Sequence, residues 1–186
     1  MKLYLKGKIL KSDSKAIAVV GSRLMTARGE LLTKKFVKEF VKNGYTIISG
    51  LARGIDTAAH QTALKEGGRT IAVLGSGLDI IYPFENKNLS EDIIKHGALV
   101  SPFPNGTKPL PNNFLARNRI IVELSKAVLV VEGKRRSGTL STASWAANLG
   151  VEVFAIPGSE ATDWLINEGA NSVKSPKELI NKLWIW

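Results

Sequence analysis

The sequence predicts an α/β fold with a doubly wound, mostly parallel sheet and helices on both faces. Apolar runs recur along the chain, and helical patterns separate them. The runs are continuous rather than alternating, which indicates strands that are covered on both faces. Strands that alternate with helices favour such a sheet, because parallel strands need crossover connections. We expect residues 1–186 to form a single domain.

The predicted strands are the apolar runs, most of which end in glycine or Ser-Gly. They cover 16–21, 45–50, 70–75, 98–101, 127–133 and 151–158. Helical patterns cover 27–43, 54–66, 88–96, 115–125, 139–149 and 176–183. In the first of these, Leu32, Phe36 and Phe40 share an apolar stripe, while lysines take the opposite side. The stretch 101–114 holds four prolines, and we expect this long connection to be functional or mobile.

The composition is basic, with 26 Lys and Arg against 16 Asp and Glu and a formal net charge of +10. Such a charge favours a polyanionic partner, first of all nucleic acid. The alternative is that surface lysines only confer solubility, as the lysines spread along 34–42 would allow. The chain has no cysteine, which fits a reducing cytosol. Its start does not resemble a signal peptide, and no apolar run could span a membrane, so we expect a cytoplasmic protein without a membrane partner.

Four glycine-containing corners follow predicted strands, at 21–23, 49–54, 75–79 and 134–139. In open α/β sheets, ligands bind at the carboxyl ends of the strands, where helix N-termini present free N–H groups. Glycine lets the backbone approach a phosphate closely, so we predict an anion-binding edge. Its candidate residues are Gly21, Ser22, Arg23, Ser49, Gly50, Arg53, Ser137, Gly138 and Thr139. For Arg53, a structural clamp to neighbouring carbonyls is the alternative.

Other chemistries are disfavoured by the motifs. The stretch "GSGLDI" has Ile80 where a dinucleotide fingerprint needs its third glycine, and no P-loop occurs. His60 and His96 lie far apart without carboxylate pairs at metal-ligand spacing, and no "GxSxG" elbow supports a nucleophilic serine. Asp56 lies in the first turn of its predicted helix, where the helix dipole stabilises a negative charge. We therefore expect no cofactor, no metal and no catalytic residue.

The stretch "FLARNRII" at 114–121 enters a helix from the proline-rich connection. Arg117 and Arg119 flank Asn118 there, and such a set can pair with phosphates or with carboxylates of the sheet. Phe114, which we expect on the mobile loop, can stack on an unpaired base because every base has a π-face. Packing in the core is the alternative for this ring.

Taken in order, these stretches resemble the DNA-processing protein A family (DprA/Smf). The matching stretches lie at 21–23, 49–60, 70–86, 114–121, 130–133, 137–143 and 153–158. The resemblance covers about residues 15–171 and implies an extended Rossmann-like domain. It further implies binding of single-stranded DNA, help in loading a RecA-type recombinase as in natural transformation, and a homodimer.

The resemblance also implies which residues contact DNA. The family's pocket would use Gly21, Ser22 and Arg23, with Phe114 as a base-contacting aromatic and Arg117 nearby. We add the basic run 134–136, which the resemblance leaves unassigned, because it directly precedes the last glycine corner. The added residues are Lys134, Arg135 and Arg136.

The chain departs from the family pattern in places. Pro102 stands where the family usually has Glu, and Pro111 stands where some relatives carry a DNA-contacting Lys. The flanking helical and winged-helix domains of many members are not found in this sequence. We therefore do not expect activities that depend on those domains.

Two alternatives to DNA binding remain. Nucleoside-monophosphate phosphoribohydrolases of the LOG type share the superfamily shape and carry "PGGxGTxxE". Here Ser141 and Thr142 stand where that acid is needed, and a hydroxyl cannot stabilise the developing positive charge as a carboxylate does. The other alternative is a nucleotide-sensing module, because a phosphate-binding edge alone does not distinguish a free nucleotide from a strand. We expect a DNA-binding protein rather than an enzyme.

Overall fold

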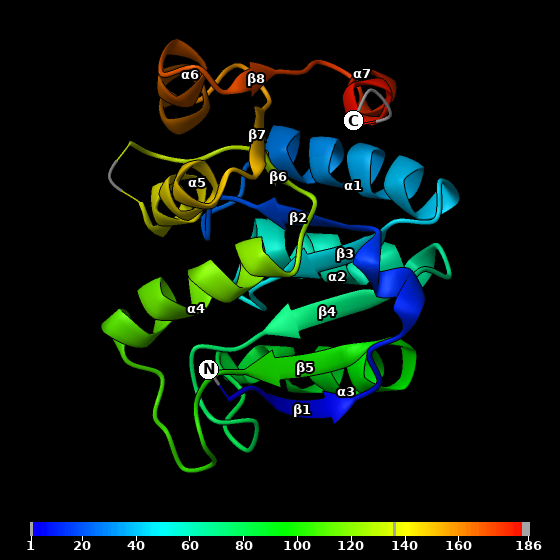
Figure 1. Cartoon of the computed structure of the whole chain (residues 1–186), viewed down its shortest axis with the longest axis vertical. Helices are drawn as coiled ribbons and strands as arrows, with labels where there is room; N and C mark the ends of the chain where they lie inside the picture. Colours follow the sequence, from blue (N-terminus) through cyan, green and yellow to red (C-terminus); the bar gives the residue numbers. More distant parts are fainter. Residues whose placement is uncertain (1, 136, 184–186) are drawn as a thin grey trace.

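A computed structural model describes residues 2–135 and 137–183. Within them, eight strands form one sheet in the order β1-β5-β4-β3-β2-β6-β7-β8 (Figure 1). The strands are β1 (Tyr4–Gly7), β2 (Ala16–Val20), β3 (Thr46–Ser49), β4 (Thr70–Val73), β5 (Ala98–Ser101), β6 (Ala127–Val130), β7 (Glu152–Ala155) and β8 (Asn171–Ser172). Strand β1 runs antiparallel to β5, and the other neighbouring strands run parallel. The predicted fold class is confirmed.

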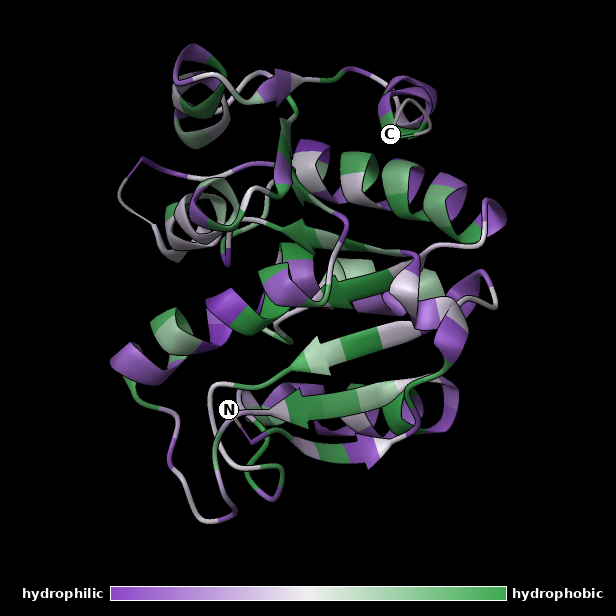
Figure 2. Ribbon diagram, in the orientation of Figure 1, coloured by the Kyte–Doolittle hydropathy of each residue, from purple (hydrophilic) through white to green (hydrophobic). Residues whose placement is uncertain are grey.

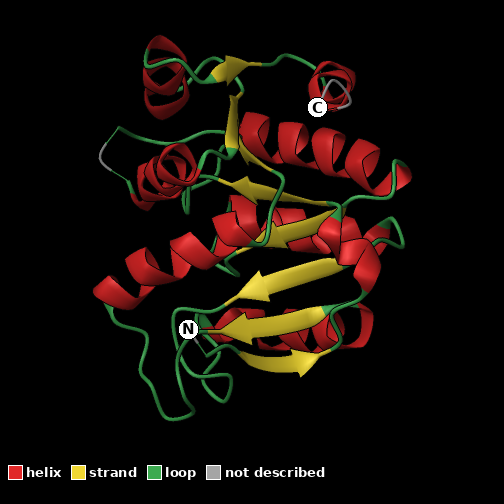
Figure 3. Cartoon of the chain, in the orientation of Figure 1, coloured by secondary structure: helices red, strands yellow, loops and turns green. Residues whose placement is uncertain are grey.

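Helices cover both faces of the sheet (Figure 3). They are α1 (Ala27–Lys42), α2 (Ile55–Lys65), α3 (Lys87–His96), α4 (Pro111–Glu123), α5 (Gly138–Leu149), α6 (Glu160–Asn167) and α7 (Pro176–Leu183), with 3₁₀ turns at Lys11–Ser14 and Phe84–Asn86. Helices α1, α2, α3 and α7 pack on one face, and α4, α5 and α6 pack on the other. Thr26 starts α1, because its side chain accepts a hydrogen bond from the N–H of Gly29.

The buried strands explain the continuous apolar runs. In β2, Ile17 and Val19 point to the face of α1, where they meet Phe36 and Phe40. The alternate residues, Ala16, Ala18 and Val20, face α4 and α5. Both faces of the strand are therefore in a core, and neither leaves room for polar side chains. Figure 2 shows the hydrophobic strands between helices that are banded in polarity.

Two edge strands and one short helix were not predicted. Strand β1 has exposed residues and no continuous apolar run, and β8 has two residues. Helix α6 spans eight residues and is capped by Ser159, whose side chain accepts a hydrogen bond from the N–H of Thr162. Short or half-exposed elements carry little hydrophobic periodicity, which is why the pattern does not reveal them.

Helix α4 begins earlier than predicted, at Pro111. Proline suits the first turn of a helix because its fixed φ matches the helical value. An N–H group at this position would have no partner within the helix, so its absence costs nothing. Phe114 therefore lies in the first turn of α4, and its predicted position on a mobile loop was wrong. The preceding loop is tied down, since the N–H of Gly106 donates to both carboxylate oxygens of Asp79 at 3.0 and 2.9 Å.

The strand order changes direction next to β2. From β2 the chain builds β3, β4 and β5 on one side, and it then returns to place β6, β7 and β8 on the other. Such a switch point at the carboxyl ends of parallel strands is where open α/β sheets bind ligands. We name this edge the carboxyl rim and define it by the loops after β2, β3, β4 and β6, residues 21–26, 50–54, 74–83 and 131–135. It lies on the left in Figure 1, where the arrows of β4 and β5 point.

Within residues 2–135 and 137–183, no helix combines the length and the apolar composition that crossing a bilayer requires.

Candidate nucleic-acid interface

Arg117 connects α4 to two strands from within the core. Its side chain is only 3% exposed. One guanidinium nitrogen, Nη1, donates to the carbonyl oxygens of Gly50, at 2.5 Å, and of Val73. These carbonyls lie at the ends of β3 and β4. A Cβ atom at Gly50 would lie 2.4 Å from Nη1, so only glycine leaves room for this contact.

The charge of Arg117 is balanced by Asp56, which is also buried. The carboxylate of Asp56 accepts hydrogen bonds from the N–H groups of Gly50, at 3.1 Å, and Ala52, at 3.4 Å. Burial raises the pKa of Asp56, and attraction to Arg117 opposes this rise. Burial lowers the pKa of Arg117 to about 10. Asp56 therefore lies in the first turn of α2 as predicted, and it holds the loop before that helix.

Phe114 lies where several parts of the rim meet. Its half-buried ring rests on the backbone of Gly75, where an added Cβ would lie 2.5 Å from the ring atom Cδ1. The ring of Tyr82 lies 5.7 Å away between centroids, with 45° between the planes. The guanidinium carbons of Arg23 and Arg117 lie 5.3 and 5.8 Å from the Phe114 centroid. We name Arg23, Tyr82, Phe114 and Arg117 the Phe114 cluster.

The loop that carries Arg23 is held by its backbone. The N–H of Ser22 donates to the carbonyl of Glu132 at 3.0 Å, and the carbonyl of Ser22 accepts from the N–H of Ile55 at 3.1 Å. Gly54 has φ +73°, and a Cβ there would lie 2.2 Å from the oxygen of Ser22. Arg23 itself is exposed. The loop thus presents an exposed guanidinium from a fixed backbone.

Glu132 occupies the N-terminus of the nearest helix, α1. Its carboxylate accepts hydrogen bonds from the N–H and the hydroxyl of Thr26, both at 2.7 Å. A Cβ at Gly29 would lie 2.3 Å from its carboxyl carbon. A free helix N-terminus was predicted along this edge, but the chain's own carboxylate occupies the N-terminus of α1.

Arg53 lies on the rim but already has an anionic partner. Its guanidinium makes a two-pronged contact with Glu85, with Nη2 donating to Oε2 at 3.0 Å and Nε donating to Oε1. Both side chains are 54% exposed. The hydrogen bonds from Arg53 lower the pKa of Glu85. The alternative for Arg53 was a clamp to neighbouring carbonyls. This alternative was wrong about the partner, because Arg53 contacts a carboxylate.

The loop after β6 is next to the loop that carries Arg23, because β6 pairs with β2. Lys134 and Arg135 are exposed. The guanidinium carbon of Arg135 lies 5.7 Å from the ring centroid of Trp164. Arg136, also predicted as a contact, lies outside the described residues. The inference that this run shares an edge with Arg23 therefore holds for the two described residues.

The predicted site residues fall into groups by exposure. The exposed group comprises Arg23, Arg53, Lys134, Arg135 and Gly138, and the half-buried group comprises Gly21, Ser22, Phe114 and Ser137. The buried group comprises Ser49, Gly50, Arg117, Asn118 and Thr139. In this group, the hydroxyl of Ser49 donates to the carbonyl of Val19 at 2.7 Å, and the amide of Asn118 donates to the carbonyl of Gly138 at 3.3 Å. These buried groups are engaged within the fold, so the exposed and half-buried residues form the surface that a ligand meets.

Three residues that shape the site were not among the predicted ones: Gly75, Tyr82 and Glu132. Gly75 and Tyr82 belong to a stretch that was recognised, 70–86, but no spacing rule connects them to Phe114. An aromatic residue shortly after a glycine corner was the available signal for Tyr82. For Glu132 it was an acid directly after a strand at the switch point.

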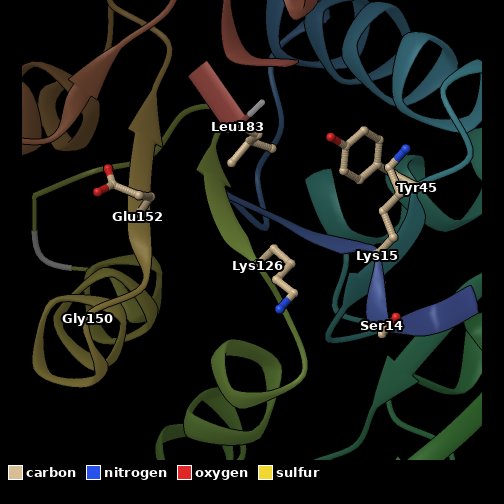
Figure 4. Close-up of a pocket in the computed structure, with 7 residues that line it drawn as sticks. All are labelled: Ser14, Lys15, Tyr45, Lys126, Gly150, Glu152 and Leu183. Atoms are coloured by element: carbon tan, nitrogen blue, oxygen red, sulfur yellow. The ribbon is translucent and has the colours of Figure 1, made fainter. Parts of the chain in front are cut away.

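A groove of about 730 Å³ lies at the opposite edge of the sheet (Figure 4). Its lining comprises Ser14, Lys15, Tyr45, Lys126, Gly150, Glu152 and Leu183. The Nζ of Lys15 donates to the carbonyl of Asn43 and lies 4.4 Å from the Tyr45 ring centroid. The groove therefore lies at the amino ends of the strands, away from the rim.

The site and the fold agree with a known family. Residues 1–184 match the model of the family described as DNA recombination-mediator protein A. The chain belongs to this family. The resemblance inferred from the motifs is thereby confirmed, and the match extends beyond the range 15–171 that those motifs cover.

Relatives of the DNA recombination-mediator protein A family show how much of a full-length member this chain represents. Protein Smf of Escherichia coli is 46% identical over 97% of this chain and 50% of its own length, so the chain spans about half of that relative. The X-ray structure of DNA processing protein A from Streptococcus pneumoniae has a TM-score of 0.90 and 43% identity, covering 96% of this chain and 65% of that one. A Helicobacter pylori structure, which concerns the single-stranded DNA binding mode of that DNA processing protein A, has a TM-score of 0.90 and 31% identity over 98% of this chain and 86% of that one.

Proposed function

We propose that this chain binds single-stranded DNA along the carboxyl rim, as a DNA-processing protein that assists the loading of a RecA-type recombinase. The Phe114 cluster carries the proposal, because it joins an accessible aromatic surface to an exposed guanidinium at the switch point of the sheet. A formal net charge of +10 supports a polyanionic ligand. Membership of the family and the H. pylori relative support the same ligand.

We assign different roles in binding a strand to the individual residues of the rim. Arg23, Lys134 and Arg135 are exposed cations that can pair with phosphates without breaking a contact within the core. Phe114 offers its ring to a base, and stacking on an aromatic side chain requires an unpaired base. Arg117 is buried, so its role is to hold α4 over the ends of β3 and β4 rather than to meet the strand.

We propose that binding occurs without catalysis. Ser141 and Thr142 lie in α5 at the position where the phosphoribohydrolases need an acid. One acid of the rim, Glu132, is buried and hydrogen-bonded to Thr26. Incubation of the protein with nucleoside monophosphates should release no free base. Base release that purifies with the protein and disappears in Glu132→Gln would contradict this proposal.

The partners beyond DNA rest on family membership. We propose a RecA-type recombinase as the protein partner, a homodimer as the working form and the cytoplasm as the location. Pull-down of a purified recombinase on DNA-loaded protein, with sedimentation of the free protein, tests the first two.

The DNA proposal is tested by titrating the protein with labelled oligo-dT and with duplex of equal length. Single-stranded DNA should bind more tightly, because only unpaired bases reach the ring of Phe114. Phe114→Ala should weaken binding of the single strand by about 1–3 kcal/mol. Equal affinity for both forms would contradict the proposal.

A further inference from the structure

Tyr82 is the more open of the two aromatic rings at the rim. It is 43% exposed, whereas Phe114 is half-buried and already meets Gly75, Arg23 and Arg117 around its ring. The loop after β4 carries both Tyr82 and Gly75, on which Phe114 rests, and the loop after β3 separates it from the loops after β2 and β6. An aromatic ring so exposed beside a DNA-binding surface offers a face that the fold itself does not use.

The two rings are arranged so that they cannot share one base. Their planes are inclined by 45° at a centroid separation of 5.7 Å. A flat base that lies parallel to one ring is therefore inclined to the other. Two neighbouring bases of a strand, which rotate independently about their sugars, can each lie on one ring.

Cations are positioned at both ends of this aromatic pair. Arg23 lies at the Phe114 end. At the other end lies Arg53, whose pKa is raised most by Glu85 and less by Tyr82. The phenol of Tyr82 therefore lies close to the guanidinium of Arg53. A strand that crosses the rim from β6 toward β4 would pass Lys134 and Arg135 after β6, Arg23 after β2, Arg53 after β3 and the ring of Tyr82 after β4.

We propose that Tyr82 is a second base-stacking residue, which takes the nucleotide next to the one on Phe114. The inference rests on the proposed function, and it adds the direction of the strand, across the carboxyl ends of β2, β3 and β4. The ligand is a pair of consecutive unpaired nucleobases in a single strand. The competing role for Tyr82 is support, in which its ring only holds Phe114 in place.

The test measures the affinity of variants for oligo-dT and for an abasic strand of the same length, at low salt where phosphate contacts keep binding measurable. Tyr82→Leu removes the ring and keeps an apolar side chain against Phe114. Tyr82→Phe keeps the ring. Phe84→Leu is the matched control, because Phe84 lies two residues away, is 77% exposed and has no ring contact among those that the structure describes.

Tyr82→Leu should weaken binding of oligo-dT by about 5- to 150-fold, the range for one stacked base. Most of this loss should remain in a Phe114→Ala background, because the two rings take separate bases and only the contact between the rings couples the two substitutions. Binding of the abasic strand should not change, and Tyr82→Phe and Phe84→Leu should bind as the unaltered protein does. Thermal melts of each variant check that the fold is intact.

Three results would overturn the inference. They are an unchanged affinity of Tyr82→Leu for oligo-dT, a loss that vanishes in the Phe114→Ala background, and an equal loss in Phe84→Leu. A chain that binds oligo-dT through Phe114 but is indifferent to Tyr82→Leu refutes only this inference. A chain that does not prefer single strands at all refutes the proposed function as well.

Discussion

The ring of Phe114 rests on Gly75, and no other residue type fits beneath it. A Cβ at Gly75 would lie 2.5 Å from Cδ1 and 2.8 Å from Cε1 of the ring. Glycine at this corner therefore serves a side chain of α4. The close approach connects the end of β4 to the aromatic surface of the rim.

Gly75→Ala should displace the Phe114 ring and weaken binding of oligo-dT, while the strands and helices stay in place. We expect a loss of up to about 1–3 kcal/mol, the contribution of one stacked base. The measurement is a double-mutant cycle with Phe114→Ala. If the effect of Gly75→Ala persists in full without the Phe114 ring, the substitution acts by another route.

Arg23→Ala should weaken binding and flatten its salt dependence. Each phosphate neutralised on a single strand contributes about −0.7 to the slope of log affinity against log salt, and Arg23 is exposed without a carboxylate partner among the described ion pairs. Affinities at several salt concentrations give this slope. Lys65→Ala at the C-terminal end of α2 removes the same charge far from the rim and should leave the slope nearly unchanged. An Arg23 variant with a lower Tm and an unaltered slope would identify the residue as a loop clamp.

Glu85→Gln should tighten binding of single strands. In the free protein the carboxylate of Glu85 occupies the guanidinium of Arg53, so a phosphate has to compete with it. Without that competitor we expect Arg53 to neutralise a phosphate and the salt slope to steepen by about 0.7. Glu168→Gln, an equal charge change at the end of α6, is the control. A steepening of the same size in both variants would show a general charge effect only.

Arg117→Ala should destabilise the protein strongly. It leaves the carbonyls of Gly50 and Val73 without their donor and Asp56 buried without a counter-charge. Removing one member of a buried charged set costs about 3–5 kcal/mol, and about 2–4 °C of Tm corresponds to each kcal/mol at this chain length. Thermal unfolding with and without oligo-dT measures this. A variant with an unchanged Tm but weaker DNA binding would instead place Arg117 in contact with the strand.

His60 should make the protein less stable as the pH falls. The imidazole is buried, its Nδ1 lies 2.6 Å from the hydroxyl of Thr70, and its Nε2 has no hydrogen-bond partner among the residues that the structure describes. Burial, with repulsion from Arg117, lowers its pKa from 6.5 to about 3. The folded state thus keeps the neutral ring, while the unfolded chain binds a proton below about pH 6.5. The stability from this group is complete above that pH and is lost as the pH falls toward 3.

The slope from His60 should approach about 1.4 kcal/mol of unfolding free energy per pH unit near pH 5 and be about half as large at pH 6.5. Denaturant titrations between about pH 5 and 6.5 measure it. His60→Gln should lose this slope, whereas His96→Gln, at the exposed end of α3, should keep it. A retained slope in His60→Gln would assign the pH dependence to other groups.

The core strands and helices were predictable because each is a local pattern. Buried parallel strands read as unbroken apolar runs, and β5 at 98–101 agrees with its prediction residue for residue. The start of α4 was missed because proline was interpreted as part of a loop, although the first turn of a helix accepts it. Strands β1 and β8 form because they pair with β5 and β7 at the edges of the sheet. Local sequence patterns do not predict such pairing.

The residues of the site also fall into those that local patterns reveal and those that only the tertiary structure places. Local composition was enough to place glycines, Arg23, Lys134 and Arg135 at the carboxyl ends of strands, and the ordered motifs were enough to find the family. Whether each side chain faces solvent depended on distant partners. Arg117 can be buried because two carbonyls accept its hydrogen bonds and Asp56 balances its charge. Arg53 is engaged because Glu85, from the 3₁₀ turn Phe84–Asn86, pairs with it. Such pairings join residues 32 to 67 positions apart, and packing of the whole sheet brings them within hydrogen-bonding distance.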